Sequence, residues 1–178
     1  MGVGTLAAYL DEVIGQQATD QLIYKYELGV NMVGDVFRKN ILWQTTPAGD
    51  FADADIIEID EDGTIKTADK LTDLIYKEYG QEVGADVGFF GGKLAKESDI
   101  VCVVQEPLIC LQLAHFLPLY TWLAVGYNRL LTPIKLDSLA GKKTRLFADD
   151  EMLEEWRELA KKSATNAQVT PISIIYAK

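Results

Sequence analysis

Acidic and amide side chains follow the ends of three predicted strands in the C-terminal half of the chain. The strands are predicted at Ile100–Val104, Tyr120–Val125 and Thr144–Ala148, and the residues after them are Gln105-Glu106, Gly126-Tyr127 and Asp149-Asp150-Glu151. In open parallel sheets, functional groups gather just beyond the carboxyl ends of the strands. Carboxylates from two neighbouring strand ends would form an oxygen-rich site, which suits Mg²⁺ and phosphoryl chemistry.

Two of these acids have a second interpretation. A helix is predicted from Asp150 to Lys162, and Asp is one of the preferred residues at a helix N-cap. The residue types alone leave open whether Asp149 and Asp150 cap this helix or belong to a metal site.

The C-terminal half has the alternation of strands and helices that is typical of a parallel α/β sheet. Ile100–Val104 is continuously apolar, as expected for a strand covered on both faces, and Pro107 suits the first turn of the next helix. The β-branched run Ile172–Tyr176 is predicted to close the sheet as a fourth strand. We therefore expect residues 99–178 to form one α/β domain.

The N-terminal half follows a different pattern, from which we expect a small α+β region over residues 1–98. Two short helices are predicted around Leu6–Ile14 and Ala18–Leu28. They are followed by a predicted antiparallel meander at Asn40–Thr46, Ala54–Asp60 and Thr64–Thr67, and then by a helix from Ala68.

The net charge of −10 lies entirely in the N-terminal half. Residues 1–98 hold 18 acids and 8 bases, whereas residues 99–178 hold 9 of each. Asp50–Asp62 contains seven acids and no Lys or Arg. Because this charge repels a phosphate backbone, we expect at most weak binding of nucleic acid. The segment is either a solvated hairpin or, through Asp53, Asp55 and Glu58, a surface for a protein partner that is basic.

Several other classes of protein are excluded by the sequence. The longest apolar stretch, Leu108–Leu123, is interrupted by Pro118, so no membrane helix is predicted, and we expect a cytoplasmic protein. Cys102 and Cys110 lie in a strand pattern and a helix pattern, eight residues apart, and are expected to be reduced, buried thiols.

The order of these segments resembles a Toprim domain, and more closely the Toprim-like proteins of unknown function from Bacteroidetes, their phages and their mobile elements. That family has a strand ending in a VESEKTA-type motif, a WLATGG-type segment and an LFPD-type strand end before a Trp-bearing helix. The matching segments here are Ile100–Glu106, Trp122–Gly126, Leu146–Asp149 and Trp156, with Ile41–Gln44 and Gly88–Gly91 matching upstream family segments. The resemblance implies a Toprim-like parallel sheet flanked by helices, related to primases and topoisomerases.

The chain departs from the family at the positions that carry its chemistry. The resemblance places Gln105 where a Toprim site has its catalytic glutamate, and an amide neither titrates nor binds a metal strongly. Glu106 is adjacent, but a shift of one residue along a strand turns a side chain to the opposite face. Asp149 and Glu151 would be an Asp-x-Glu variant of the family's metal pair, with Asp150 between them, and Tyr127 replaces the family's second glycine.

These departures lead to an expectation about function. We expect a non-catalytic Toprim-like protein of a mobile element or phage that acts by binding a protein, and the alternative is a Mg²⁺-dependent nucleic-acid enzyme or accessory factor. Gly126, Tyr127 and Arg129 are further candidate binding residues at the strand ends, with Arg129 part of a small basic rim. We expect no resident cofactor and at most weak binding of Mg²⁺.

Overall fold

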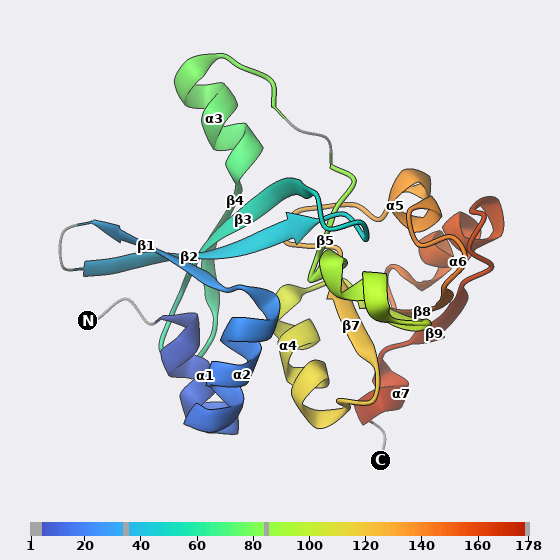
Figure 1. Ribbon diagram of the computed structural model, residues 1–178, viewed down its shortest axis with the longest axis horizontal. Coiled ribbons are helices and arrows are strands. Elements are labelled where there is room, and N and C mark those ends of the chain that lie inside the picture. The colour runs from blue at the N-terminus through green and yellow to red at the C-terminus, as the bar shows by residue number, and fades with distance from the viewer. Residues whose placement is uncertain (1–4, 34–35, 84–85, 177–178) are drawn as a thin grey trace. The chain divides into compact units, whose positions relative to one another are not determined.

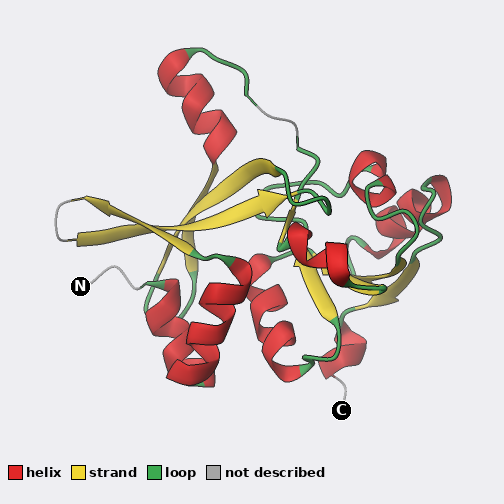
Figure 2. Ribbon diagram, viewed as in Figure 1, coloured by secondary structure: helices red, strands yellow, loops and turns green. Residues whose placement is uncertain are grey.

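The computed structural model describes residues 5–33, 36–83 and 86–176, and the chain divides into two compact units. The first unit comprises residues 1–43 and 53–84, and the second comprises residues 44–52 and 85–178. The predicted division after residue 98 stays a prediction; the contacts of the chain group residues 85–98 with the C-terminal segment. Figure 2 shows that both units contain helices and strands. No helix in the described part of the chain is long and apolar enough to cross a membrane.

The first unit combines two helices with an antiparallel meander and a third helix. In chain order its elements are α1 (Leu6–Ile14), α2 (Gln16–Tyr26), β1 (Gly29–Val33), β2 (Val36–Thr45), β3 (Phe51–Ile59), β4 (Ile65–Lys70) and α3 (Leu71–Tyr79). The strand order is β4-β3-β2, and β1 also pairs with β2. The ends of β2 and β3 that meet, residues 44–45 and 51–52, belong to the second unit. The predicted meander is confirmed, whereas β1 was not predicted.

The second unit is built on a mainly parallel sheet. Its elements are β5 (Phe89–Phe90), the 3₁₀ helix η1 (Gly92–Glu97), β6 (Ile100–Val104), α4 (Pro107–Phe116), β7 (Thr121–Ala124), α5 (Pro133–Asp137), β8 (Lys143–Ala148), α6 (Leu153–Lys162), β9 (Gln168–Pro171) and α7 (Ser173–Tyr176). The order β5-β7-β6-β8-β9 is parallel from β7 to β9, and β5 is antiparallel to β7. Figure 1 labels β5, β7, β8 and β9 of this sheet. The predicted α/β class is therefore confirmed.

Two of the segments that carried the family resemblance pair with each other. The end of β2 pairs with β5, with Gln44 opposite Phe90 and Thr45 opposite Phe89. A β-carbon added to Gly92 would lie 1.9 Å from the backbone oxygen of Thr45, so this close approach requires glycine. Segments that are 45 residues apart in the sequence thus extend the parallel sheet on the β7 side.

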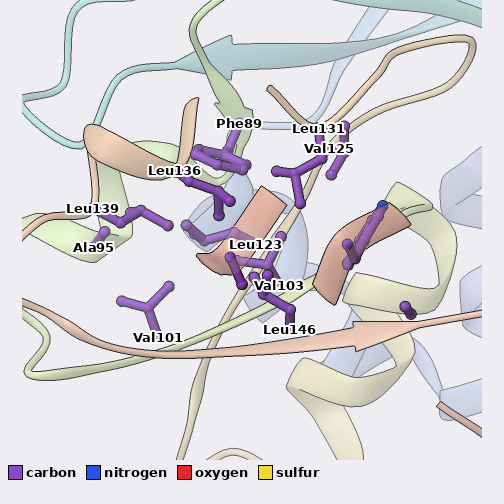
Figure 3. Packing of buried hydrophobic residues seen from close by; sticks show 13 residues of the cluster. Phe89, Ala95, Val101, Val103, Leu123, Val125, Leu131, Leu136, Leu139 and Leu146 are labelled. Carbon is purple, nitrogen blue, oxygen red and sulfur yellow. The ribbon is translucent and has the colours of Figure 1, made fainter. Parts of the chain in front are cut away.

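Each face of the sheet is covered by helices. On one face, Val101, Val103, Leu123 and Leu146 pack with residues from η1, from α6 and from the segment around α5 (Figure 3). The opposite face carries Cys102 and Trp122 and contacts α4. Burial raises the pKa of the Cys102 thiol to about 11, with the charge of Arg145 opposing the rise, so this free cysteine stays protonated.

The last predicted strand was wrong. Residues 168–171 form β9 instead, and Ser173–Tyr176 is a short helix, α7. Ala148, the last residue of β8, pairs with Pro171, and the Ile172 N–H donates to the Ala148 carbonyl at 2.8 Å. A longer strand would have no neighbour beyond that point, and the apolar side chains of Ile174 and Tyr176 remain exposed.

Candidate functional site

Gln105 ties the end of β6 to the segment that follows β7. Its amide nitrogen donates to the carbonyl oxygen of Gly126 at 2.9 Å and to that of Arg129 at 3.0 Å. The backbone continues the same connection, because the Gly126 N–H donates to the Gln105 carbonyl. Both hydrogens of the amide are used in these bonds, which an ionised glutamate could not make because it has no donor.

Glu106, the next residue, lies near the end of β8. Burial raises the pKa of its carboxyl, and the negative charge of Asp149 raises it further. The two neighbours therefore differ in what they interact with: Gln105 bonds to the backbone after β7, and the carboxyl of Glu106 is influenced by the charge of Asp149. The resemblance assigns Gln105 to the family's glutamate position, whereas the carboxyl belongs to the next residue, Glu106.

Asp149, Asp150 and Glu151 lie between β8 and α6. Burial raises the pKa of Asp149, as do the charges of Asp150 and then Glu151. Helix α6 begins only at Leu153, its N-cap is Met152, and no side chain donates or accepts a capping hydrogen bond there. The interpretation of the two aspartates as helix caps is therefore wrong; only the backbone carbonyl of Asp149 contributes, by accepting from the Met152 N–H.

Tyr176 of α7 was missed by the sequence reasoning. Most of its side chain is exposed, but partial burial raises the pKa of its hydroxyl, and the charges of Asp149 and Glu106 act in the same direction. No sequence signal would have placed it here, because residues 172–176 have the pattern of a strand. The charge of Asp149 thus acts on both Glu106 and Tyr176 at one edge of the sheet.

Arg129 does not belong to an exposed basic rim, because its side chain is fully buried. Its guanidinium contacts the Asp86 carboxylate at 3.1 Å, and the buried Lys135 ammonium contacts the same oxygen at 2.7 Å. Burial acts to raise the pKa of Asp86, but the hydrogen bond and charge of Lys135 and the charge of Arg129 outweigh it and hold the pKa below its ordinary value. Tyr127, another candidate, accepts at its hydroxyl a long hydrogen bond of 3.4 Å from the Leu108 N–H.

The acids of the predicted hairpin from Asp53 onwards belong to the first unit, and two of the three proposed binding residues are buried. Asp53 and Asp55 are 2% and 1% exposed, so they cannot present charge to a partner. Asp53 accepts hydrogen bonds from the N–H and hydroxyl of Thr72 at 3.1 and 2.9 Å, which fastens the start of α3. Glu58 pairs with Lys39 at 3.3 Å. At Asp53 and Asp55 both interpretations, a solvated surface and a partner-binding surface, are therefore wrong, whereas Asp50, Glu61 and Asp62 are exposed.

Glu106 and Asp149 are the interacting carboxyls that the sheet edge offers to a metal ion. Among residues 5–33, 36–83 and 86–176, no three His, Cys, Asp or Glu side chains gather closely enough to hold a metal ion. Glu106 and Asp149 supply a pair of carboxylates, and Gln105 directs its amide nitrogen at backbone carbonyls. The site therefore has two carboxyls with raised pKa values, those of Glu106 and Asp149, and the neutral, hydrogen-bonded amide of Gln105.

The fold is similar to that of solved primase structures. One match is a chain from the structure of bacteriophage T7 lagging-strand DNA polymerase interacting with primase domains, with 13% identity, a TM-score of 0.53 and coverage of 84% of this chain and 72% of that one. The primase fragment of the bacteriophage T7 primase-helicase protein matches with 12% identity, a TM-score of 0.52 and coverage of 84% and 59%. The Aquifex aeolicus primase, with its zinc-binding and RNA polymerase domains, matches with 16% identity, a TM-score of 0.52 and coverage of 96% and 43%.

These likenesses show a primase-type, Toprim-like fold. The chain spans about half the length of the second and third of these primase chains. No curated protein matches the sequence. Residues 4–150 match a family described as "Domain of unknown function (DUF6371)", and the chain is therefore a member of the DUF6371 family.

Proposed function

We propose that this chain is a Toprim-like protein of a phage or mobile element that does not catalyse phosphoryl transfer and acts by binding a protein partner in DNA replication. The observation that carries the proposal is the position of Gln105. The sequence resemblance assigns Gln105 to the strand end where a Toprim enzyme has its glutamate, and its amide bonds to two backbone carbonyls. A group with no titrating proton at this position cannot act as the general base.

The primase neighbours support the replication context. One of them comes from a structure in which primase domains interact with a DNA polymerase. A chain that keeps this fold without the catalytic glutamate would retain surfaces for protein contacts. The partner is therefore expected among the proteins of a replication assembly.

Primer synthesis on single-stranded DNA, with nucleoside triphosphates and either Mg²⁺ or Mn²⁺, tests the catalytic half of the proposal. The same reactions are examined for nuclease products, with an active phage primase as the positive control. We expect no primers and no cleavage. Turnover by the wild-type protein that is lost in Asp149→Asn would overturn the proposal.

The alternative function is a Mg²⁺-dependent nucleic-acid enzyme or accessory factor. One observation favours it, namely that the negative charge of Asp149 raises the pKa of Glu106, so that two carboxyls belong to one site. Calorimetric titration distinguishes the two functions. The main proposal expects Mg²⁺ affinity in the millimolar range or none, because hard cations need several anionic oxygens. Micromolar affinity abolished by Asp149→Asn would favour the enzyme.

A further inference from the structure

A groove of about 370 Å³ lies beside α6 and β9 in the second unit. It is lined by Arg157, Ala160, Lys161, Asn166, Ala167 and Val169. None of these residues belongs to the strand-end group around Gln105, Glu106 and Asp149. The groove is therefore a separate feature of the same unit, and Figure 1 shows α6 beside β8 and β9.

Strand β9 is the outer strand of the parallel sheet. It pairs with β8 and ends the strand order of the described residues. The Ile172 N–H points towards β8, since it donates to the Ala148 carbonyl. Backbone groups alternate in direction along a strand, so the N–H and C=O of Val169 point to the open edge. Val169 also lines the groove, which places its backbone groups beside the space.

The α6 side of the groove is positively charged. Arg157 and Lys161 lie one helical turn apart and pair with Glu154 and Glu158 on the same helix. The side chains of these glutamates are 80% and 56% exposed. Exposed pairs of this kind contribute little to stability, so both cations can exchange their partners for an incoming carboxylate.

We propose that this groove binds an extended, acidic segment of a partner protein, which adds a strand to β9. The segment would hydrogen-bond to the backbone of Val169 and place its carboxylates against Arg157 and Lys161. Ala160, Ala167 and Val169 provide an apolar floor for its alternate side chains. The inference deepens the partner-binding half of the proposed function and rests on it.

The chemistry of the groove favours a peptide over a nucleic acid. The open edge offers backbone donors and acceptors at the spacing of a strand, which a peptide matches. Single-stranded nucleic acids are usually held by aromatic side chains on which the bases stack, and none lines this groove. Pro171 has no N–H and closes the edge at one end, so the added strand is expected to be short.

Fluorescence anisotropy with a labelled hexapeptide, acetyl-Val-Asp-Val-Glu-Val-Asp-amide, tests the proposal on the full chain. We expect saturable binding, no binding of the same peptide with lysine at its three acidic positions, and a loss of roughly tenfold or more when alternate backbone nitrogens are methylated, because methylation removes the strand hydrogen bonds. The methylated peptide needs no change in the protein, so this comparison does not depend on the folding of any variant.

Protein variants then locate the binding. Arg157→Gln with Lys161→Gln is expected to weaken binding of the acidic peptide, whereas Lys162→Gln, on the same helix but outside the groove, leaves it unchanged. Val169→Pro removes an N–H from the open edge and should abolish binding. Val169→Ala keeps that N–H and controls for the lost packing of the side chain. Thermal melts of all variants confirm that they are folded.

The outcomes separate this inference from the proposed function. Absence of saturable binding at 1 mM peptide, roughly the weakest affinity that such an assay resolves, would overturn the inference. The inference would also be overturned if Lys162→Gln weakened peptide binding as much as the double variant, or if an eight-residue oligothymidine competed as well as the acidic peptide. Either result would indicate attraction to negative charge alone. None of these results changes the outcome of the primer-synthesis assay, and primer synthesis by the wild-type chain would leave peptide binding to β9 intact.

Discussion

At the scale of single residues, the strand-end site is determined by which way two neighbouring side chains point. Gln105 donates to backbone carbonyls after β7, and Glu106 lies near Asp149. The resemblance to Toprim proteins predicted that the glutamine would remove the general base, and it could not show that the amide has a structural role of its own. The bonds to Gly126 and Arg129 make Gln105 a residue on which local stability depends.

Replacing Gln105 by Glu is expected to destabilise the protein at neutral pH. The new carboxylate would face two carbonyl oxygens without a donor, at a cost of roughly 1–3 kcal/mol. Lowering the pH protonates the carboxyl and restores one donor, so the loss should shrink in acid. Urea unfolding across pH measures both effects. Gln105→Met, which loses the same bonds without adding charge, should be destabilised equally at every pH, and an identical pH dependence in the two variants would contradict the explanation.

Glu106 and Asp149 should give the protein a measurable dependence of stability on pH. Both carboxyls have raised pKa values in the folded chain, so they bind protons more tightly when folded than when unfolded. Their contribution to stability is complete below the unfolded pKa values and is lost as the pH rises through the folded ones.

Asp149→Asn is therefore expected to raise the free energy of unfolding at pH 7 and to lower the pKa of Glu106, because it removes the negative charge that raises that pKa. Carboxyl NMR titration follows the pKa, and chemical denaturation follows the stability. Glu155→Gln, an exposed acid on α6, is the matched control. An unchanged pKa of Glu106 in the Asp149→Asn variant would show that the two carboxyls do not interact.

At the scale of elements, a buried acid fixes the position of a helix, which the sequence alone does not determine. Strand β3 is buried almost without interruption from Ala52 to Ile57, although Asp53 and Asp55 interrupt its apolar pattern. Asp53 is oriented towards the first turn of α3, where it accepts from the N–H and hydroxyl of Thr72. The helix has no buried residue of its own, so this anchor is an important part of what holds it.

Asp53→Ala is expected to loosen α3 and to cost about 1–3 kcal/mol, because it leaves a helix N-terminus without its acceptor. Hydrogen exchange of residues 71–79 should speed up in this variant more than exchange in β6. Thr72→Val, which loses only the hydroxyl bond, should have a smaller effect. Asp50→Ala, at the exposed turn before β3, is the control that should leave α3 unchanged. Equal protection of α3 in the wild type and in Asp53→Ala would contradict this role.

At the scale of the whole molecule, charge is distributed between the halves of the sequence very unevenly. The net charge of −10 comes from residues 1–98, and residues 99–178 are neutral. Some of that charge is buried and paired, as at Asp53, and some lies in surface pairs such as Glu58 with Lys39. The remaining acids repel one another through solvent, and this repulsion is screened by salt.

Raising the concentration of NaCl from about 0.05 to 0.5 M, which shortens the screening length from roughly 14 to 4 Å, is therefore expected to stabilise the protein. The midpoint of urea unfolding should rise with salt and reach a plateau. Sucrose at matched osmolarity controls for effects other than screening. A midpoint that falls with salt would show that attractive ion pairs outweigh the repulsion.

Much of the fold was predictable from the sequence because it depends on local pattern. The continuous apolar run of β6, the proline at the start of α4 and the amphipathic α6 follow from burial and backbone chemistry within each segment. The positions of Gln105 and Asp149, just beyond the ends of two strands, were also predicted from the sequence alone. The same reasoning predicted the α/β class and the antiparallel meander.

Tertiary structure decided what the local pattern could not. Register determined that the sheet ends at Pro171, because β8 provides no partner beyond Ala148, and the apolar run after it became α7. Long-range packing buried Asp53, Asp55 and Arg129, which the sequence alone places at a surface because charged side chains are rarely buried unless they are paired. It also brought Tyr176 to Glu106 and Asp149, and Asp86 to Lys135. These residues are so far apart in the sequence that residue types and spacing carry no information about their contact.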